Sequence, residues 1–219
     1  MTPPTVIVGV IFLTSFLFSH YVSLMSKTLE NKPDDTKDQK SKDDVFWSIF
    51  DAVIKLDITK GHMSWSISDV ARTSGVSRPL IYYYFGKSKE NIMQTAVDYL
   101  GKEYFGLSDE RMELWKNRNI FESVSRSRKL WQKSPYSYSF YILRRDLQNP
   151  VGEAIRDLEA KYEDKLKTFY PHASRDLHAA VTAILFCLAI SSTLTDEGLR
   201  NAVKIIEQYL ALARGQSPL

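Results

Sequence analysis

One stretch of the chain, Ser66 to Phe85, combines hydrogen-bond donors, a cation and aromatic rings at helical spacing. In its second half, Arg78 is followed by the tyrosine run Tyr82 to Tyr84. Arginine can pair bidentately with guanine in the major groove, and aromatic edges can meet thymine methyl groups. These residues are therefore suited to contact double-stranded DNA. The alternative is that the tyrosines pack a helix corner, but a packed helix buries one face and these residues occupy three.

Two short helices joined by a glycine turn are expected to position these side chains. Ser66 can cap the first helix, and Asp69, three positions later, can reach back to it. Gly75 can adopt the positive φ that a turn between crossed helices requires. Ser77 is expected to cap the second helix, and Pro79 lies in its first turn, where a missing N–H costs nothing. The pattern predicts a helix-turn-helix whose second helix fits the major groove.

Apolar residues in and before this stretch predict the core of a small domain. Leu80 or Ile81, together with Phe85, can anchor the second helix. A supporting helix is predicted over residues 44–56, ending near Lys60 and Gly61, with apolar residues on one side. These residues are Val45, Ile49, Ala52, Val53 and Leu56. We expect His62, just after Gly61, to be a solvated loop residue.

One motif spans both helices of the pair. It runs Ala71-x-x-x-Gly75-Val76-Ser77 and continues as Ile81-Tyr82-Tyr83-Tyr84-Phe85 with a lysine after it. The motif resembles the DNA-binding domain of the TetR/AcrR family of transcriptional regulators. The resemblance implies an all-α protein, with an N-terminal three-helix DNA-binding domain followed by a larger helical domain for effector binding and dimerisation. It further implies a regulator, usually a ligand-released repressor, that binds a palindromic operator as a homodimer.

The resemblance also implies which residues form the DNA-binding surface. They are Ser66, Ser68, Ser77, Arg78, Pro79, Tyr82, Tyr83, Tyr84, Lys87 and Lys89. Arg78 and Tyr83 are the expected base readers, and Pro79 shapes the start of the helix. Two departures stand out: Leu80 replaces a small or polar residue, and the spacing from Phe85 to Lys89 is one residue longer than usual. Either Lys87 or Lys89 is therefore the expected phosphate contact.

The rest of the chain has no strand pattern, repeat or glycine-rich phosphate loop. Helix-length segments are predicted at residues 109–133, 136–148, 151–170, 174–192 and 197–213, and Pro135, Pro150 and Pro171 lie at or near their starts or breaks. We predict a DNA-binding domain at residues 44–88 and an effector-binding and dimerisation domain at residues 89–219. The net charge of +3 gives weak independent support for DNA binding.

The last two predicted helices are candidates for a dimer interface. The run Val181 to Ile190 is apolar almost all round, and the next helix has apolar residues at intervals of three or four. Those residues are Leu199, Val203, Ile206, Leu210 and Ala213. Two such helices from each subunit would form a four-helix bundle, as in the family. The alternative is that they form the core of a monomer.

Aromatic residues gather between these regions, where the family binds small molecules. The candidate pocket residues are Trp115, Phe121, Trp131, Tyr138, Tyr141 and Phe169. Such pockets are mostly apolar with a few orienting polar groups, so a largely apolar effector is expected. The alternative for any one of these residues is a place in the core.

The sequence contains few residues in patterns typical of catalysis, cofactor binding or metal binding. Cys187 stands in an apolar run, where we expect a small buried thiol. His172 and His178 have no metal-ligand pattern around them. We expect Arg144 to Asp146 and Asp157 to Glu163 to be solvated helix faces. No catalytic residue, cofactor or metal is predicted.

The N-terminus has two interpretations. Residues 1–24 contain an apolar run, Thr5 to Leu24, long enough to span a bilayer. It is either an inner-membrane anchor, with the DNA-binding domain in the cytoplasm, or the product of a mis-assigned start, with translation beginning at Met25 and giving a cytoplasmic protein. Residues 25–43 are expected to be a charged flexible linker.

The rival functional hypothesis is a membrane-tethered helical sensor or interaction module that no longer binds a specific operator. Its support is Leu80 and the lengthened spacing from Phe85 to Lys89. A membrane partner is expected only if residues 1–24 are translated.

Overall fold

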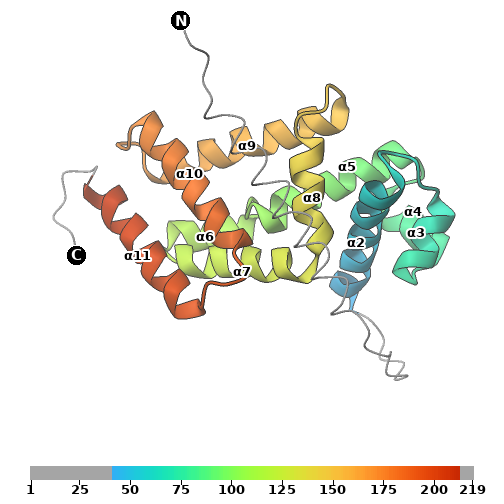
Figure 1. Ribbon diagram of the computed structural model, residues 1–219, viewed down its shortest axis with the longest axis horizontal. Coiled ribbons are helices and arrows are strands. Elements are labelled where there is room, and N and C mark those ends of the chain that lie inside the picture. Colours follow the sequence, from blue (N-terminus) through green and yellow to red (C-terminus); the bar gives the residue numbers. More distant parts are fainter. Residues whose placement is uncertain (1–40, 213–219) are drawn as a thin grey trace, which may run out of the picture. The chain divides into compact units, whose positions relative to one another are not determined.

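The computed structural model describes residues 41–212. The described residues contain helices and no strand, as the sequence predicts (Figure 1). The elements are α2 (Lys42–Lys60), α3 (Ile67–Ser74), α4 (Arg78–Phe85), α5 (Lys89–Tyr99), the π-helical turn η1 (Leu100–Tyr104), α6 (Asp109–Lys116), α7 (Ile120–Lys133), α8 (Pro135–Arg144), α9 (Pro150–Phe169), α10 (Arg175–Ile190) and α11 (Asp196–Leu212). The predicted fold class is confirmed.

Helices α3 and α4 form the predicted helix-turn-helix. Ser66 and Asp69 cap α3 reciprocally, each side chain bonding the other's backbone N–H. Gly75 ends α3 with φ of 68° in the left-handed region, where glycine carries no Cβ penalty. Ser77 stands at the start of α4 but makes no side-chain capping bond, so that part of the prediction is wrong. Pro79 in the first turn instead pre-sets the helical φ there.

The structure shows which of Leu80 and Ile81 anchors α4 in the core of this domain. Ile81 and Phe85 are buried with Val70, while Leu80 is exposed. Helix α2 supports them as predicted and ends at Lys60 before Gly61. It also buries Phe50 and Ile54, because α3, α5 and α8 pack on different sides of it.

The segment predicted as one helix over residues 109–133 is two helices. Helix α6 ends at Lys116 and α7 begins at Ile120. Between them Arg118 has a positive φ of 56°, and the Asn119 side chain caps α7 by accepting from the Glu122 N–H at 3.3 Å. Asparagine side chains compete for backbone groups in this way and interrupt helices. Helix α8 ends at Arg144, earlier than the residue 148 that was predicted.

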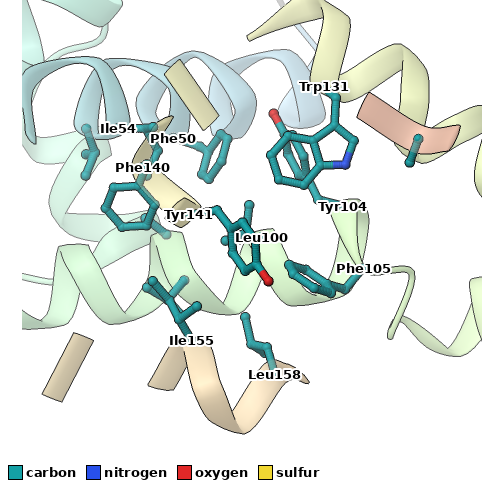
Figure 2. Packing of buried hydrophobic residues seen from close by; sticks show 14 of the residues in the cluster. Phe50, Ile54, Leu100, Tyr104, Phe105, Trp131, Phe140, Tyr141, Ile155 and Leu158 are labelled. Carbon is teal, nitrogen blue, oxygen red and sulfur yellow. The ribbon is translucent and has the colours of Figure 1, made fainter. Parts of the chain in front are cut away.

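The central core forms around α5 and η1 (Figure 2). Leu100, Tyr104 and Phe105 meet side chains from α2, α7, α8 and α9. Gly101 permits close packing here, since a Cβ on it would lie 2.4 Å from Leu158 Cδ2 on α9. One continuous core therefore runs from the helix-turn-helix into the later helices.

The apolar stripe of α11 lies inside the chain. Leu199, Val203, Ile206 and Leu210 are all buried in the same core. The prediction that these residues form a dimer interface is therefore wrong, because α11 packs this face on α7 and α10 of its own chain. Ala213 lies outside the described residues.

No helix within residues 41–212 is long and apolar enough to cross a bilayer. The apolar run predicted in residues 1–24 and residues 25–40 of the charged linker predicted for residues 25–43 lie outside the described part of the chain. The linker prediction is wrong for Lys42 and Asp43, because they form the start of α2, with Ser41 as its N-cap.

Candidate functional site

The exposed face of α4 carries the predicted base readers. Because Ile81 and Phe85 fix the opposite face in the core, Arg78 and Tyr83 point to solvent, and Tyr83 is 78% exposed. Tyr82 and Tyr84 are half-buried. Tyr84 meets the ring of Phe46 edge-on with centroids 6.1 Å apart, so corner packing accounts for Tyr84 and not for Tyr83.

Polar groups at the start of α3 adjoin this face. Ser66 and Ser68 are exposed, but the Ser66 hydroxyl is already engaged with Asp69. Lys60 Nζ lies 2.8 Å from Asp69 Oδ1. The hydrogen bond from Lys60, together with those from the backbone and side chain of Ser66, holds the pKa of the Asp69 carboxyl well below its usual range. Asp69 therefore stays ionised, and the cap that orients α3 persists at any pH near neutrality.

The two candidate lysines occupy different environments. Lys89 Nζ donates to the Met63 carbonyl at 3.0 Å and lies 5.8 Å from the centroid of the Trp65 ring. Lys87 is exposed. The structure thus ties Lys89 to the loop before α3, while Lys87 stands on the surface beside α4.

A buried ion pair joins the end of α2 to the end of α8. The Asp57 carboxylate is fully buried, and Arg144 Nε donates to it at 2.6 Å. His62 Nδ1 lies 3.3 Å from Asp57 Oδ1, and His62 Nε2 lies 3.1 Å from Asn149 Nδ2. The predictions of a solvated His62 and a solvated Arg144 are therefore wrong, because folding brings the two segments together around Asp57.

A cavity of about 490 Å³ lies among η1, α6, α7, α8, α9 and α10. Of the six candidate pocket residues, Trp115, Trp131 and Tyr141 line it. The other three are not among the lining residues: Phe121 lies under Arg200, Tyr138 packs on Trp131, and Phe169 packs on Trp115.

Sequence reasoning missed much of the cavity wall. Tyr104 and Phe105 come from η1 and the residue after it, Tyr162 from α9 and Phe186 from α10. The aromatic type of these residues was visible, but residues this far apart in sequence gave no sign that they would meet. Figure 2 shows the rings of Trp131 and Tyr104 side by side, with Phe105 on the same side of the core.

Charged groups also line the cavity. Arg145 binds the Glu159 carboxylate through two bonds of 2.8 and 3.0 Å, and the Tyr141 hydroxyl donates to the same carboxylate. Burial, followed by these contacts with Glu159, raises the pKa of Tyr141. The segment Asp157 to Glu163 is therefore not the solvated face that was predicted, since its Glu159 faces the cavity.

Lys165 is a buried cation of the wall. It is 2% exposed, donates to the Gly106 carbonyl at 2.8 Å and lies 4.2 Å from the centroid of Trp115. Burial, and next the charge of Arg111, lowers the pKa of Lys165 well below its usual value. Arg111 is itself buried behind the wall, and burial lowers its pKa to about 10.

Other candidates for chemistry show no site. Cys187 is exposed and not buried as expected, because it lies on the outward side of α10. His178 is buried and bonded to the Tyr170 carbonyl at 2.9 Å. Within the described residues, no group of His, Cys, Asp and Glu side chains could hold a metal ion.

Comparison with known families identifies the helix-turn-helix. Residues 49–96 match the model of bacterial regulatory proteins of the tetR family. These residues are therefore similar to the DNA-binding domain of tetR-family regulators. The matched TetR segment includes α3 and α4 and most of α2 and α5.

The chain was also compared with solved structures and with curated proteins. A solved structure from Syntrophomonas wolfei, described as a TetR-family transcriptional regulator, is 18% identical over 80% of this chain and 97% of its own, with a TM-score of 0.42. No curated protein matches the chain.

Proposed function

We propose that this protein is a ligand-responsive TetR-family transcriptional regulator that binds a palindromic operator as a homodimer and, as a repressor, is released by its effector. The observation that carries the proposal is the geometry of α4. Its apolar face is locked by Ile81 and Phe85, while Arg78 and Tyr83 are left exposed. A rigid helix with an exposed cation and a largely exposed ring suits major-groove binding.

In this proposal residues 44–88 bind DNA and residues 89–219 hold the effector and the dimer contacts. Arg78 and Tyr83 read bases, and the remaining polar and basic residues of the predicted surface position the helix on phosphates. Among the lysines, Lys87 is favoured as the phosphate contact, because Lys89 already donates to Met63. Phosphate contacts of this kind orient a protein without reading sequence.

The proposed dimer surface lies on the outer sides of α10 and α11. Ile184, Ile205 and Tyr209 are exposed there, and the last two are four residues apart on one helix face. Exposed apolar groups clustered on two neighbouring helices are typical of a protein interface. A two-fold dimer would present its two α4 helices to half-sites about 34 Å apart.

The proposed route of control runs through α5. Helix α5 packs on α4 and continues into η1, whose Tyr104 lines the cavity with the adjacent Phe105. A ligand that fits the cavity better in one arrangement of these residues would favour one placement of α4. A ligand with equal affinity for both arrangements would change nothing.

The test is a selection of bound fragments from random double-stranded DNA with the full-length chain at near-physiological salt. We expect an enriched palindrome with half-sites about one helical turn apart. Arg78→Ala should weaken the enrichment and relax it at one base position of each half-site, whereas Arg175→Ala, which replaces an exposed arginine at the start of α10, should leave it unchanged. No enrichment by a folded dimer would favour the membrane-tethered sensor or interaction module instead.

A further inference from the structure

Two buried cations adjoin the cavity, and neither contacts a carboxylate within the described residues. Lys165 Nζ makes one hydrogen bond, to the Gly106 carbonyl at 2.8 Å. Arg111 donates to neutral acceptors only, among them Ser127 Oγ at 2.6 Å and the Glu103 carbonyl at 3.0 Å. An ammonium has three donors, so Lys165 keeps two that Gly106 does not use. Buried cations normally pair with an anion, because burial without a counter-charge is costly.

The carboxylates of the cavity wall are engaged elsewhere. Glu159 is held by Arg145 at 2.8 Å and by the Tyr141 hydroxyl. Glu163 lies 3.3 Å from the exposed Lys167. The wall therefore carries Arg145, Arg156 and Lys165 against these two acidic residues, with Arg111 as a further cation behind it.

Two polar atoms of the wall have no hydrogen-bond partner within the described residues. They are Trp131 Nε1 and Thr182 Oγ1, both buried atoms of residues that line the cavity. Trp131 as a whole is 6% exposed. A buried donor without a partner is uncommon in a native protein and calls for an acceptor. These atoms provide an orienting site apart from the cation.

Aromatic rings connect the two polar regions. Phe105 lies 6.1 Å from Tyr162, which is 5.2 Å from Lys165 Nζ. Phe105 also lies 6.3 Å from Phe186, whose ring is 5.7 Å from that of Trp131. A flat or extended apolar body would be covered along this path. The polar groups lie toward its two ends.

We infer that the cavity binds an organic carboxylate with an apolar body, whose carboxylate accepts hydrogen bonds from Lys165 and whose other end accepts one from the Trp131 indole N–H. The inference rests on the proposed function, because it takes this cavity to be the effector site. It adds an anionic group to the largely apolar effector that the sequence predicts. The negative charge compensates Lys165 and Arg111, two buried cations that contact no carboxylate within the described residues.

A bound carboxylate should stabilise the charged form of Lys165. Burial and the charge of Arg111 lower the pKa of Lys165, and a bound carboxylate would raise it again because an opposite charge favours the ammonium. The titratable groups facing Lys165 are Arg111 from α6 and Tyr162 and Glu163 from α9. Arg111 stays charged with a pKa of about 10, Tyr162 stays neutral because burial raises its pKa, and Glu163 is paired with Lys167.

The test uses calorimetric titration of the full-length protein without DNA. The probes are 2-naphthoate, 4-phenylbutyrate and decanoate, each against its uncharged amide. We expect at least one carboxylate to bind about tenfold more tightly than its amide. Lys165→Met should abolish this preference. Lys161→Met, the same change at an exposed position of α9, should keep it.

Several results would overturn the inference. Equal binding of carboxylate and amide, or no binding by any of the three carboxylates, would each do so, and both are measured on the unmodified chain. Preserved preference in a folded Lys165→Met variant would do so as well. Because no DNA is present, these results are independent of the fragment selection that tests the proposed function.

Discussion

The exposed face of α4 and the surroundings of the cavity both carry cationic side chains, but the two regions differ in how far these side chains are exposed to solvent. On α4, Arg78 and Tyr83 are exposed. Around the cavity, Lys165 and Arg111 are buried and bonded to backbone carbonyls. The exposed side chains of α4 keep their hydration in the free protein and can bind a DNA backbone, which supplies the counter-charge. The buried cations have lost their hydration and are already oriented, so they favour a small anionic ligand whose charge compensates for that loss.

Between these two regions lies the ion pair of Asp57 and Arg144, which connects α2 to α8. It holds the helix-turn-helix to the helices that build the cavity, and it is the most deeply buried ion pair that the described residues contain. Disrupting it tests whether the two regions depend on a shared core. The experiments below separate the two regions, beginning with the largest expected effect.

Arg144→Met should lower the free energy of unfolding by about 3–5 kcal/mol, because it leaves the Asp57 carboxylate buried without its arginine. Urea denaturation followed by circular dichroism measures the change. Arg72→Met is the matched control, since its pair with Asp69 is exposed on the Arg72 side and should contribute less than about 1 kcal/mol. Similar losses in the two variants would show that the Asp57 pair does not hold the regions together.

Arg78→Ala should weaken specific DNA binding by about 1–3 kcal/mol and relax the preference at one base position. Titration of the selected operator and of operators altered at single positions measures both effects. Thermal stability should stay unchanged, since Arg78 is exposed. A uniform loss over all operators would make Arg78 a phosphate contact and not a base reader.

Lys87→Ala should weaken binding evenly across sequences and reduce the slope of log K against log salt by about 0.9 for each DNA phosphate that this lysine neutralises. Lys89→Ala should instead cost about 1 kcal/mol of stability, because the Met63 carbonyl loses its donor. Binding isotherms at several salt concentrations distinguish the two lysines. The assignment fails if the slope changes only in the Lys89 variant.

Ser66→Ala and Ser77→Ala compare the two helix starts. Ser66 makes both bonds of a capping box, so its loss should cost about 1 kcal/mol. Ser77 makes no capping bond, so its loss should cost only a few tenths of a kcal/mol in the absence of DNA. Chemical denaturation of both variants measures the difference. Equal losses would mean that Ser77 caps α4 in solution.

The helix-turn-helix was predictable because its interactions are local. The cap at Ser66, the left-handed Gly75 and the first-turn Pro79 each act within a few residues, so the sequence displays the interacting groups side by side. The same kind of local signal was present at Asn117 to Asn119, where the predicted helix is interrupted. It was missed because the apolar spacing continues through the break.

The cavity was only partly predictable. The aromatic residues of the sequence correctly predicted Trp115, Trp131 and Tyr141 as lining residues. The other three predicted residues, Phe121, Tyr138 and Phe169, do not line the cavity. Composition shows that a helix carries rings, and it does not show which neighbour each ring will face. That choice depends on how α6 to α10 cross one another.

The amino-acid sequence by itself determined the helical class, the capped helix-turn-helix and the similarity of that segment to tetR-family DNA-binding domains. Only the tertiary structure decided which charges are buried. Arg144 meets Asp57 across 87 positions and Lys165 meets Gly106 across 59, so neither contact leaves a local pattern. The sequence predicts solvated helix faces at Arg144 to Asp146 and at Asp157 to Glu163. The burial of Asp57 and Lys165, and with it the inferred anion site, follows from the helices that fold over them.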